Sequence, residues 1–259
     1  MVIAMRNEAE NITNEELLLE LNKNKDQNAP LINVVERECH VDVLKIGNSI
    51  CIRDKISGTH MISTENWCEL KVLLEKIEEK LDTFMITTNS YKNEILHKFP
   101  RVMVSEYELY TMQKQNYVSY NWTIEDFEVV KLDLDWMNYI LFHYKDKEFG
   151  NEKYISDRIL LGCGLGLLYR GEKAAFLLQH KDGEIGPVFV EPKFRGRRLG
   201  SELTKRFHEL LFEKSSILYA FIEKSNRISA RTIIKSGYKK ANNDILWVYR
   251  MKNGTLYLP

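Results

Sequence analysis

Apolar and polar positions in the first half of the chain follow two different periods. The stretch VDVLKIGNSICIRD alternates around Gly47-Asn48, two residues that tolerate a positive φ, and this predicts a β-hairpin. From Trp67 to Leu81 the apolar residues recur at helical spacing, and two later apolar runs enclose another short helical segment. The order hairpin, helix, strand, helix, strand predicts an α/β unit, preceded by a short amphipathic helix over residues 15–21.

The second half of the chain has a clearer pattern. An apolar strand and two helical segments lead to three apolar runs, at residues 163–169, 173–179 and 184–191. Turns at Arg170-Gly171 and Asp182-Gly183 separate these runs, and Asp-Gly is a strong hairpin signal. A helix with one apolar face, a buried type of strand, a capped helix and terminal strands follow. This order predicts a mixed sheet with helices on both faces.

A polar stretch with scattered aromatic residues, QKQNYVSYNWTIED, lies between the two patterns and has no clean period. We therefore place a domain boundary near residue 118, with an N-terminal α/β domain over residues 1–118 and a second domain over residues 119–259. A chain of 259 residues is long enough for each part to bury a core of its own. The predicted fold class is α/β, with the mixed sheet of an α+β protein.

Composition and charge narrow the functional classes. The chain has 37 lysines and arginines and 37 aspartates and glutamates, so we expect no general binding to nucleic acid or to a membrane surface. The N-terminal stretch lacks the apolar core of a secretory signal, and the longest apolar run, Ile159 to Tyr169, is too short to span a bilayer. The four cysteines form no CxxC pair and the six histidines show no ligand spacing. We expect free thiols, a cytoplasmic location and no metal site.

One segment, Glu191 to Phe212, concentrates positive charge in a chain that has no net charge. Within fifteen positions it has six basic residues and two glycines, opposed only by Glu202. The segment follows an apolar strand and leads into the helix with one apolar face. Glycines let backbone N–H groups converge on an anion, a helix N-terminus adds its positive end, and arginines add forked donors. The pattern predicts a diphosphate-binding turn whose spacing is neither that of a Walker loop nor that of a Rossmann loop.

The sequence VFVEPKFRGRRLGSEL in this segment resembles the coenzyme A-binding segment of the GNAT superfamily of N-acetyltransferases. In that superfamily a strand, the pattern [RQ]xxGx[GA] and a helix follow one another. Arg195 and Gly200 match the two ends of the pattern. Arg198 stands where the middle glycine is usual, a departure that a helical backbone would tolerate if its N–H stays usable.

Downstream, NRISARTIIKSGY resembles the second signature of the superfamily, with matches at Asn226, Ser229, Gly237 and Tyr238. Asn226 can equally serve only as a helix cap. The resemblance covers residues 127–251. The layout in two halves is also similar to the glycine N-acyltransferase-like branch, in which a degenerate GNAT-like half precedes the catalytic one.

The resemblance implies the GNAT acyl-CoA N-acyltransferase fold for the second domain and acetyl-CoA as the acyl-donor substrate. In the superfamily the pantetheine arm lies along the central strand, and the acceptor amine enters a gap between two splaying strands, here GPVFVEP and ILYAFIE. A backbone N–H stabilises the developing oxyanion, and a base takes a proton from the ammonium. The implied cofactor-binding residues are Val188, Phe189, Val190, Arg195, Gly196, Arg197, Arg198, Leu199, Gly200, Ser201, Asn226 and Ser229.

The candidates for the base are glutamates at the ends of the splaying strands. Glu223 is favoured over Glu191 and Glu184, because it precedes Asn226 at the mouth of the gap. Many relatives protonate the leaving thiolate with a tyrosine of the second signature, and that position is Ile233 here. Tyr238 is the alternative donor, although its position is more often part of the core. A glutamate near a strand end is also often only a solvated surface residue.

Two functions of different classes stay open. The first is an acetyl-CoA-dependent N-acetyltransferase that acts on a primary amine of a small molecule or a peptide. The alternative is a catalytically weak or inactive coenzyme A-binding module, which the isoleucine at position 233 motivates. We expect neither nucleic acid nor a membrane as partner. The acceptor and the length of the acyl chain stay open, and so does a homodimer.

Overall fold

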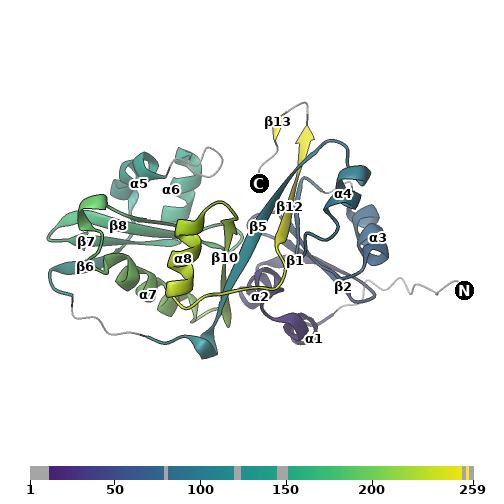
Figure 1. Ribbon diagram of the computed structural model, residues 1–259, viewed down its shortest axis with the longest axis horizontal. Coiled ribbons are helices and arrows are strands. Elements are labelled where there is room, and N and C mark those ends of the chain that lie inside the picture. Colours follow the sequence, from purple (N-terminus) through teal and green to yellow (C-terminus); the bar gives the residue numbers. More distant parts are fainter. Residues whose placement is uncertain (1–11, 79–80, 120–123, 145–150, 253–254, 257–259) are drawn as a thin grey trace, which may run out of the picture.

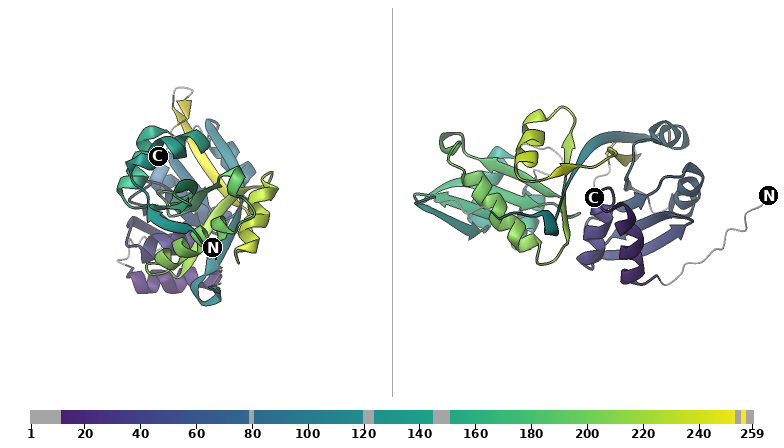
Figure 2. Two further views of the ribbon diagram at one scale, coloured as in Figure 1. Left: turned by 90° about the vertical axis from the view of Figure 1, so that its left-hand side faces the viewer. Right: turned by 60° about the horizontal axis from the view of Figure 1, so that its bottom comes forward.

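The computed structural model describes residues 12–78, 81–119, 124–144, 151–252 and 255–256. Its strands form a nine-stranded sheet and a four-stranded sheet, which lie side by side (Figures 1 and 2). Helices pack against both faces of each sheet, so the predicted α/β fold with a mixed sheet is confirmed.

The N-terminal part of the chain builds most of the larger sheet. Its elements are α1 (Asn14–Leu21), α2 (Ala29–Glu36), β1 (His40–Ile46), β2 (Ser49–Asp54), β3 (His60–Ser63), α3 (Trp67–Ile77), β4 (Thr83–Ile86), α4 (Lys92–Lys98) and β5 (Val102–Gln113). Alternation along β2 places Ile50 and Ile52 in the core beneath α1 and α2, whereas Cys51 lies in the core beneath α3. The pairing of β3 with β4 is parallel, whereas β1, β2 and β3 pair antiparallel.

The C-terminal part builds the smaller sheet and contributes to the larger one. Its elements are β6 (Phe127–Lys131), α5 (Met137–His143), α6 (Glu152–Leu160), β7 (Gly164–Tyr169), β8 (Glu172–Gln179), β9 (Ile185–Val190), α7 (Leu199–Leu211), β10 (Ile217–Glu223), α8 (Arg227–Lys235), β11 (Lys239–Lys240), β12 (Ile245–Lys252) and β13 (Thr255–Leu256). Strands β6 to β9 pair antiparallel in chain order. Along β8, Ala175 and Leu177 face the core under α7, whereas Phe176 and Leu178 face the core under α5 and α6.

The two parts exchange strands in the larger sheet. Its order is β1-β2-β3-β4-β12-β5-β10, so the C-terminal β12 lies between two N-terminal strands. In turn, the N-terminal β5 lies between β12 and β10, and it crosses the centre of the molecule between the two parts (Figure 1). Residues on both sides of position 118 therefore contribute to one sheet, and the boundary at that position stays a prediction.

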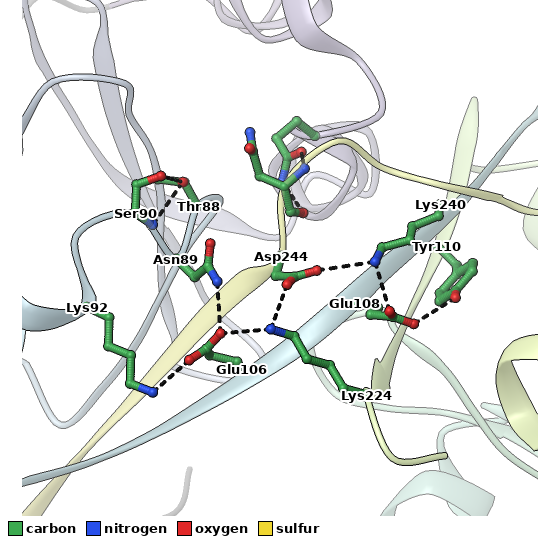
Figure 3. Close-up of polar contacts among 12 residues, drawn as sticks. Thr88, Asn89, Ser90, Lys92, Glu106, Glu108, Tyr110, Lys224, Lys240 and Asp244 are labelled. Atoms are coloured by element: carbon green, nitrogen blue, oxygen red, sulfur yellow. Dashed lines mark hydrogen bonds and ion pairs between the residues drawn. The ribbon is translucent and has the colours of Figure 1, made fainter. Parts of the chain in front are cut away.

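A network of charged side chains joins the exchanged strands (Figure 3). Glu106 on β5 accepts from Lys92 at 2.6 Å and from Lys224, after β10, at 3.0 Å. Lys224 also binds Asp244, just before β12, at 2.8 Å. The hydrogen bond from Lys92, together with those from Asn89 and Lys224, lowers the pKa of Glu106 to about 2. The network therefore adds side-chain contacts to the main-chain pairing between the two parts.

Two elements of the N-terminal part differ from the sequence prediction. The pattern did not predict β3, and it ended the first helix before Pro30, where the structure has α2. Pro30 occupies the first turn of α2, where its missing N–H costs nothing. Asn33 in the middle of α2 is buried, and its side-chain amide donates to the main-chain oxygen of Ile217 at 3.3 Å. A helix buried on nearly all sides lacks the polar face that reveals helical spacing.

Candidate active site

A cleft of about 1170 Å³ opens between β9 and β10. β9 is the last strand of the smaller sheet and β10 ends the row of strands in the larger one, so the sheets part at this point. The cleft is lined by the turn after β9, the first turn of α7 and part of α8, and its wall also includes residues of the N-terminal part. The cleft thus lies between the two strands for which the resemblance to the GNAT superfamily implied a gap.

The basic turn after β9 ends at the N-terminus of α7. A short 3₁₀ helix, η5 (Pro192–Phe194), leads from β9 into the turn, and α7 begins at Leu199. Leu199, Leu203 and Phe207 are buried on one face of α7, which fixes the helix against the smaller sheet. The side chain of Arg198, the residue before α7, does not cap the first turn of the helix, which leaves the amide donors of that turn to an anion.

Arg198 precedes α7 and has a left-handed backbone, with φ 62° and ψ 10°. This conformation differs from the right-handed helical backbone that would tolerate the arginine. Glycine adopts the left-handed region without the steric cost that a Cβ brings, which explains why the resembling pattern has glycine here. In exchange, the arginine places a positive charge in the lining of the cleft.

Glycine is favoured at two positions of the turn for different structural reasons. Gly196 has φ 80°, a conformation that favours glycine, and a Cβ built there would meet open space. Gly200 lies inside the first turn of α7, and a Cβ there would lie 2.8 Å from Cγ2 of Val190. Glycine at position 200 therefore lets the start of α7 approach the end of β9.

Of the twelve residues implied as cofactor-binding, all except Arg197 line the cleft. The Nη1 atom of Arg197 donates to the Tyr169 hydroxyl at 3.5 Å, and the residue lines a separate hollow of about 440 Å³. The Nε atom of Arg195 donates to the main-chain oxygen of Val190 at 3.0 Å, which fixes this side chain to the end of β9. Asn226 caps α8, because its Oδ1 accepts from the Ser229 N–H at 3.1 Å.

Two of the three glutamates given as candidate bases, Glu223 and Glu191, lie in different surroundings. Glu223 lines the cleft at the end of β10, where it is exposed and accepts from the Ser225 hydroxyl at 3.2 Å. Glu191 accepts from the Tyr139 hydroxyl at 3.1 Å and lies 3.3 Å from Nε2 of His143, beside the cleft rather than among its lining residues. The catalytic roles of both residues stay predictions.

Glu184, the third glutamate, lies in the cleft beside a second carboxylate. Its Oε1 accepts from the Phe221 N–H on β10 at 2.8 Å, across the parting sheets. Asp182 lines the same wall, and its main-chain oxygen accepts from the buried Tyr219 hydroxyl at 2.8 Å. Burial raises the pKa of Asp182 to about 6. Burial and the nearby Asp182 carboxylate also raise the pKa of Glu184.

Tyr238 and His208 form a buried pair in the wall of the cleft. The Tyr238 hydroxyl lies 3.0 Å from Nε2 of His208, and each residue is at least 97% buried. Burial raises the pKa of Tyr238 and lowers the pKa of His208 to about 3. Tyr238 is therefore a core residue with a polar contact, and Ile233 lines the cleft nearby on α8.

The lowered pKa of His208 predicts a loss of stability in acid. An unfolded chain binds a proton at this histidine below a pH of about 6.5, whereas the folded chain binds it only near pH 3. The free energy of unfolding therefore falls as the pH drops from 6.5 toward 3, at up to about 1.4 kcal/mol per pH unit. Replacing His208 by Gln removes this slope in urea titrations, whereas replacing the exposed His97 by Gln leaves it unchanged. An equal slope in all three proteins would contradict the assignment.

The described residues were predicted to hold neither a metal site nor a membrane span. Within them, no group of three or more histidine, cysteine, aspartate or glutamate side chains could hold a metal ion. None of the helices in these ranges combines the length and the apolar surface needed to cross a bilayer. The four cysteines carry free thiols.

Several cleft residues come from segments that the sequence did not connect with the site. Thr59, just before β3, and Tyr107, on β5, belong to the N-terminal part, and Trp247 belongs to β12. His208 was not predicted either, although it lies on the apolar face of α7. Spacing along the chain gives no signal for Thr59, Tyr107 and Trp247, because the strand order of the larger sheet brings them to the cleft.

Comparisons with known proteins agree with this geometry. Residues 163–248 match the model of a family described as FR47-like protein. A Drosophila protein of solved structure is 16% identical, with a TM-score of 0.64 over 93% of this chain and 98% of that one. A GCN5-related N-acetyltransferase from Kribbella flavida is 10% identical, with a TM-score of 0.55 over 90% of this chain and 98% of that one. Comparison with curated proteins finds no match. The chain thus has the fold of the GCN5-related N-acetyltransferases along both of its parts, and its C-terminal region matches the FR47-like family model.

Proposed function

We propose that the protein is an acetyl-CoA-dependent N-acetyltransferase that transfers the acyl group directly to a primary amine. The observation that carries this proposal is the cleft between β9 and β10, which ends at the basic turn and the first turn of α7. Its volume of about 1170 Å³ exceeds the usual range of single small-molecule sites, which suits two substrates together.

The chain offers partners for each section of coenzyme A. The amides of Gly200 and Ser201 and the side chain of Arg198 suit the diphosphate, because helix N-termini and guanidinium groups both bind phosphate oxygens. β9 is an outer strand of its sheet, so it has a row of N–H and C=O groups that do not pair with β8, and in this row the Val190 oxygen accepts from Arg195. An extended arm with amide groups can add to such an edge as a further strand.

Glu184 is the base that the geometry favours. Acetyl-CoA supplies a carbonyl activated as a thioester, and the attacking amine must first lose a proton to become a nucleophile. One oxygen of Glu184 is fixed by the Phe221 N–H, and the other can take the proton from the ammonium. A raised pKa brings a carboxylate closer to the working pH of a base. The leaving thiolate takes its proton from solvent, because the Tyr238 hydroxyl already contacts His208.

A module that binds coenzyme A without catalysis is the second candidate. It is favoured by Ile233, which lines the cleft where the resembling enzymes have a tyrosine. Both functions use the basic turn and the first turn of α7 to bind coenzyme A, and they differ only in whether the acyl group is transferred.

Calorimetry with coenzyme A and a thiol-release assay with a panel of amines test the proposal. We expect binding of coenzyme A, and release of thiol from acetyl-CoA only when an amine is present. Replacing Arg198 by Ala should weaken binding about tenfold or more, the effect of one charged hydrogen bond. Replacing the exposed Lys214 by Ala, the same charge change outside the cleft, should not. Absence of binding would reject both candidates, and binding without thiol release across the panel would favour the module.

A further inference from the structure

A second part of the cleft wall comes from the N-terminal part of the chain. Thr59 and Tyr107 line it, together with Trp247 of the exchanged strand β12. The turn between β8 and β9 adds Asp182 and Glu184 to the same cleft. These residues line the cleft away from the basic turn proposed to bind the diphosphate, so they are placed to contact the acceptor.

The N-terminal part holds the turn that carries the two carboxylates. The Arg37 guanidinium on α2 donates to the main-chain oxygen of Asp182 at 2.7 Å and to Oδ1 of Asn33 at 2.7 Å. Gly183 has φ 102°, and a Cβ there would lie 2.3 Å from Oδ1 of Asn33. Glycine thus lets the turn approach α2 closely, and α2 fixes the position of Asp182 and Glu184.

The two carboxylates bring negative charge into the cleft. Neither forms an ion pair with a residue in the described ranges, and the Arg37 guanidinium binds the backbone of Asp182 rather than its carboxylate. The Lys181 ammonium lies 5.5 Å from the centre of the Tyr154 ring, a cation–π contact on the same turn. Burial raises the pKa of both carboxyl groups, with a smaller contribution from the Asp54 carboxylate to Asp182 and from the Asp182 carboxylate to Glu184, and a bound cation would favour the ionised form of both.

Thr59 is a second, independent sign of a polar ligand. Its side chain is fully buried and lines the cleft, and its Oγ1 has no hydrogen-bond partner among the described residues. Buried hydroxyl groups are nearly always hydrogen-bonded. An ammonium group in the cleft could donate to this oxygen.

An aromatic wall lies along the same part of the cleft. Tyr107 and Phe221 have ring centres 6.4 Å apart, Phe221 and Trp247 are 5.7 Å apart, and Trp247 stacks on Tyr249 at 5.8 Å. All four residues line the cleft. Aromatic faces attract cations and bury apolar groups, so this wall suits the body of an amine rather than a carboxylate.

We propose that the acceptor is a cationic amine with an apolar body and no carboxylate, bound with its ammonium group at Asp182, Glu184 and Thr59 and its body on the aromatic wall. This inference rests on the proposed function and adds the class of acceptor. It excludes α-amino acids, because their carboxylate would meet two buried acidic side chains.

Phenethylamine and phenylalanine form a matched pair, because they differ only in the carboxylate. With acetyl-CoA, we expect kcat/KM for phenethylamine to exceed that for phenylalanine by at least about a hundredfold, since close like charges disfavour a ligand strongly. Calorimetry on protein saturated with coenzyme A provides a readout that needs no turnover. It should show binding of phenethylamine and no binding of phenylalanine at the same concentration.

Replacing Asp182 by Asn should lower the preference between the two compounds at least about tenfold, because one of the two buried charges is removed. Replacing Thr59 by Val should weaken the binding of phenethylamine and leave the affinity for coenzyme A unchanged. Glu128→Gln, the same kind of change at an exposed position of β6, should alter neither quantity.

Phenylalanine that binds or reacts as well as phenethylamine would overturn the inference, and so would failure of phenethylamine to bind to the loaded protein. Failure of coenzyme A to bind would instead reject the proposed function. Calorimetry with coenzyme A alone therefore distinguishes failure of the proposed function from failure of the inference about the acceptor.

Discussion

Glutamine in place of Glu184 lowers the turnover number for acetyl transfer by about 10²- to 10⁴-fold, the range that a positioned base contributes. Glutamine keeps the shape and can still accept from the Phe221 N–H, but it cannot take a proton from the ammonium. Because burial raises the pKa of Glu184, turnover of the unmodified enzyme rises with pH as this carboxylate loses its proton. The rise should disappear in the variant, and pH profiles of kcat measure it.

Glu128→Gln is the matched control, since it makes the same change at an exposed position of β6 outside the cleft lining. We expect it to leave the pH profile unchanged. Glu223→Gln tests the residue that the sequence favours. If Glu223→Gln lowers turnover with little effect on the affinity for coenzyme A while Glu184→Gln does not, the base is Glu223, and the assignment made from the geometry is wrong.

Leucine in place of Gly200 weakens the binding of coenzyme A by at least about tenfold, the lower range of overpacking effects. Even its Cβ would lie 2.8 Å from Cγ2 of Val190, so the start of α7 must move away from β9 and its amides must shift. Folding is expected to be retained, because leucine favours a helix more than glycine does. Calorimetry gives the affinity, and circular dichroism checks the fold.

An alanine at position 200, alone and combined with a smaller residue at position 190, distinguishes a steric effect from a general loss of structure. Gly200→Ala should weaken binding less than leucine does, and adding Val190→Ala should restore affinity by making room for the new methyl group. Unchanged affinity in the leucine variant would mean that the turn does not hold the diphosphate.

The turn after β9 could be predicted because its signals are local. Strand, glycines, arginines and helix follow one another within about twenty residues, so spacing alone indicates that they meet. The left-handed backbone of Arg198 could not be predicted from the sequence, because arginine rarely adopts a positive φ. The sequence also names Glu184 but ranks it below Glu223, because the burial of Glu184 depends on contacts with α2 and β10.

The acceptor side of the cleft could not be predicted for a different reason. Thr59, Tyr107 and Trp247 lie in three separate strands or loops, and only the strand order of the larger sheet brings them together. The helix that supports the turn at Asp182 was missed as well, because it is buried on nearly all sides and has no polar face to reveal helical spacing. Long-range pairing, rather than local propensity, decides this part of the site.

The interleaved β5 and β12 have a consequence for how the molecule comes apart. Separating the N-terminal part from the C-terminal part would break main-chain hydrogen bonds of both strands at once. Neither part can therefore unfold while the other keeps its structure. Heating should then produce a single cooperative unfolding transition. A truncated chain that ends near its middle would lack β12 and would expose an unpaired edge of β4.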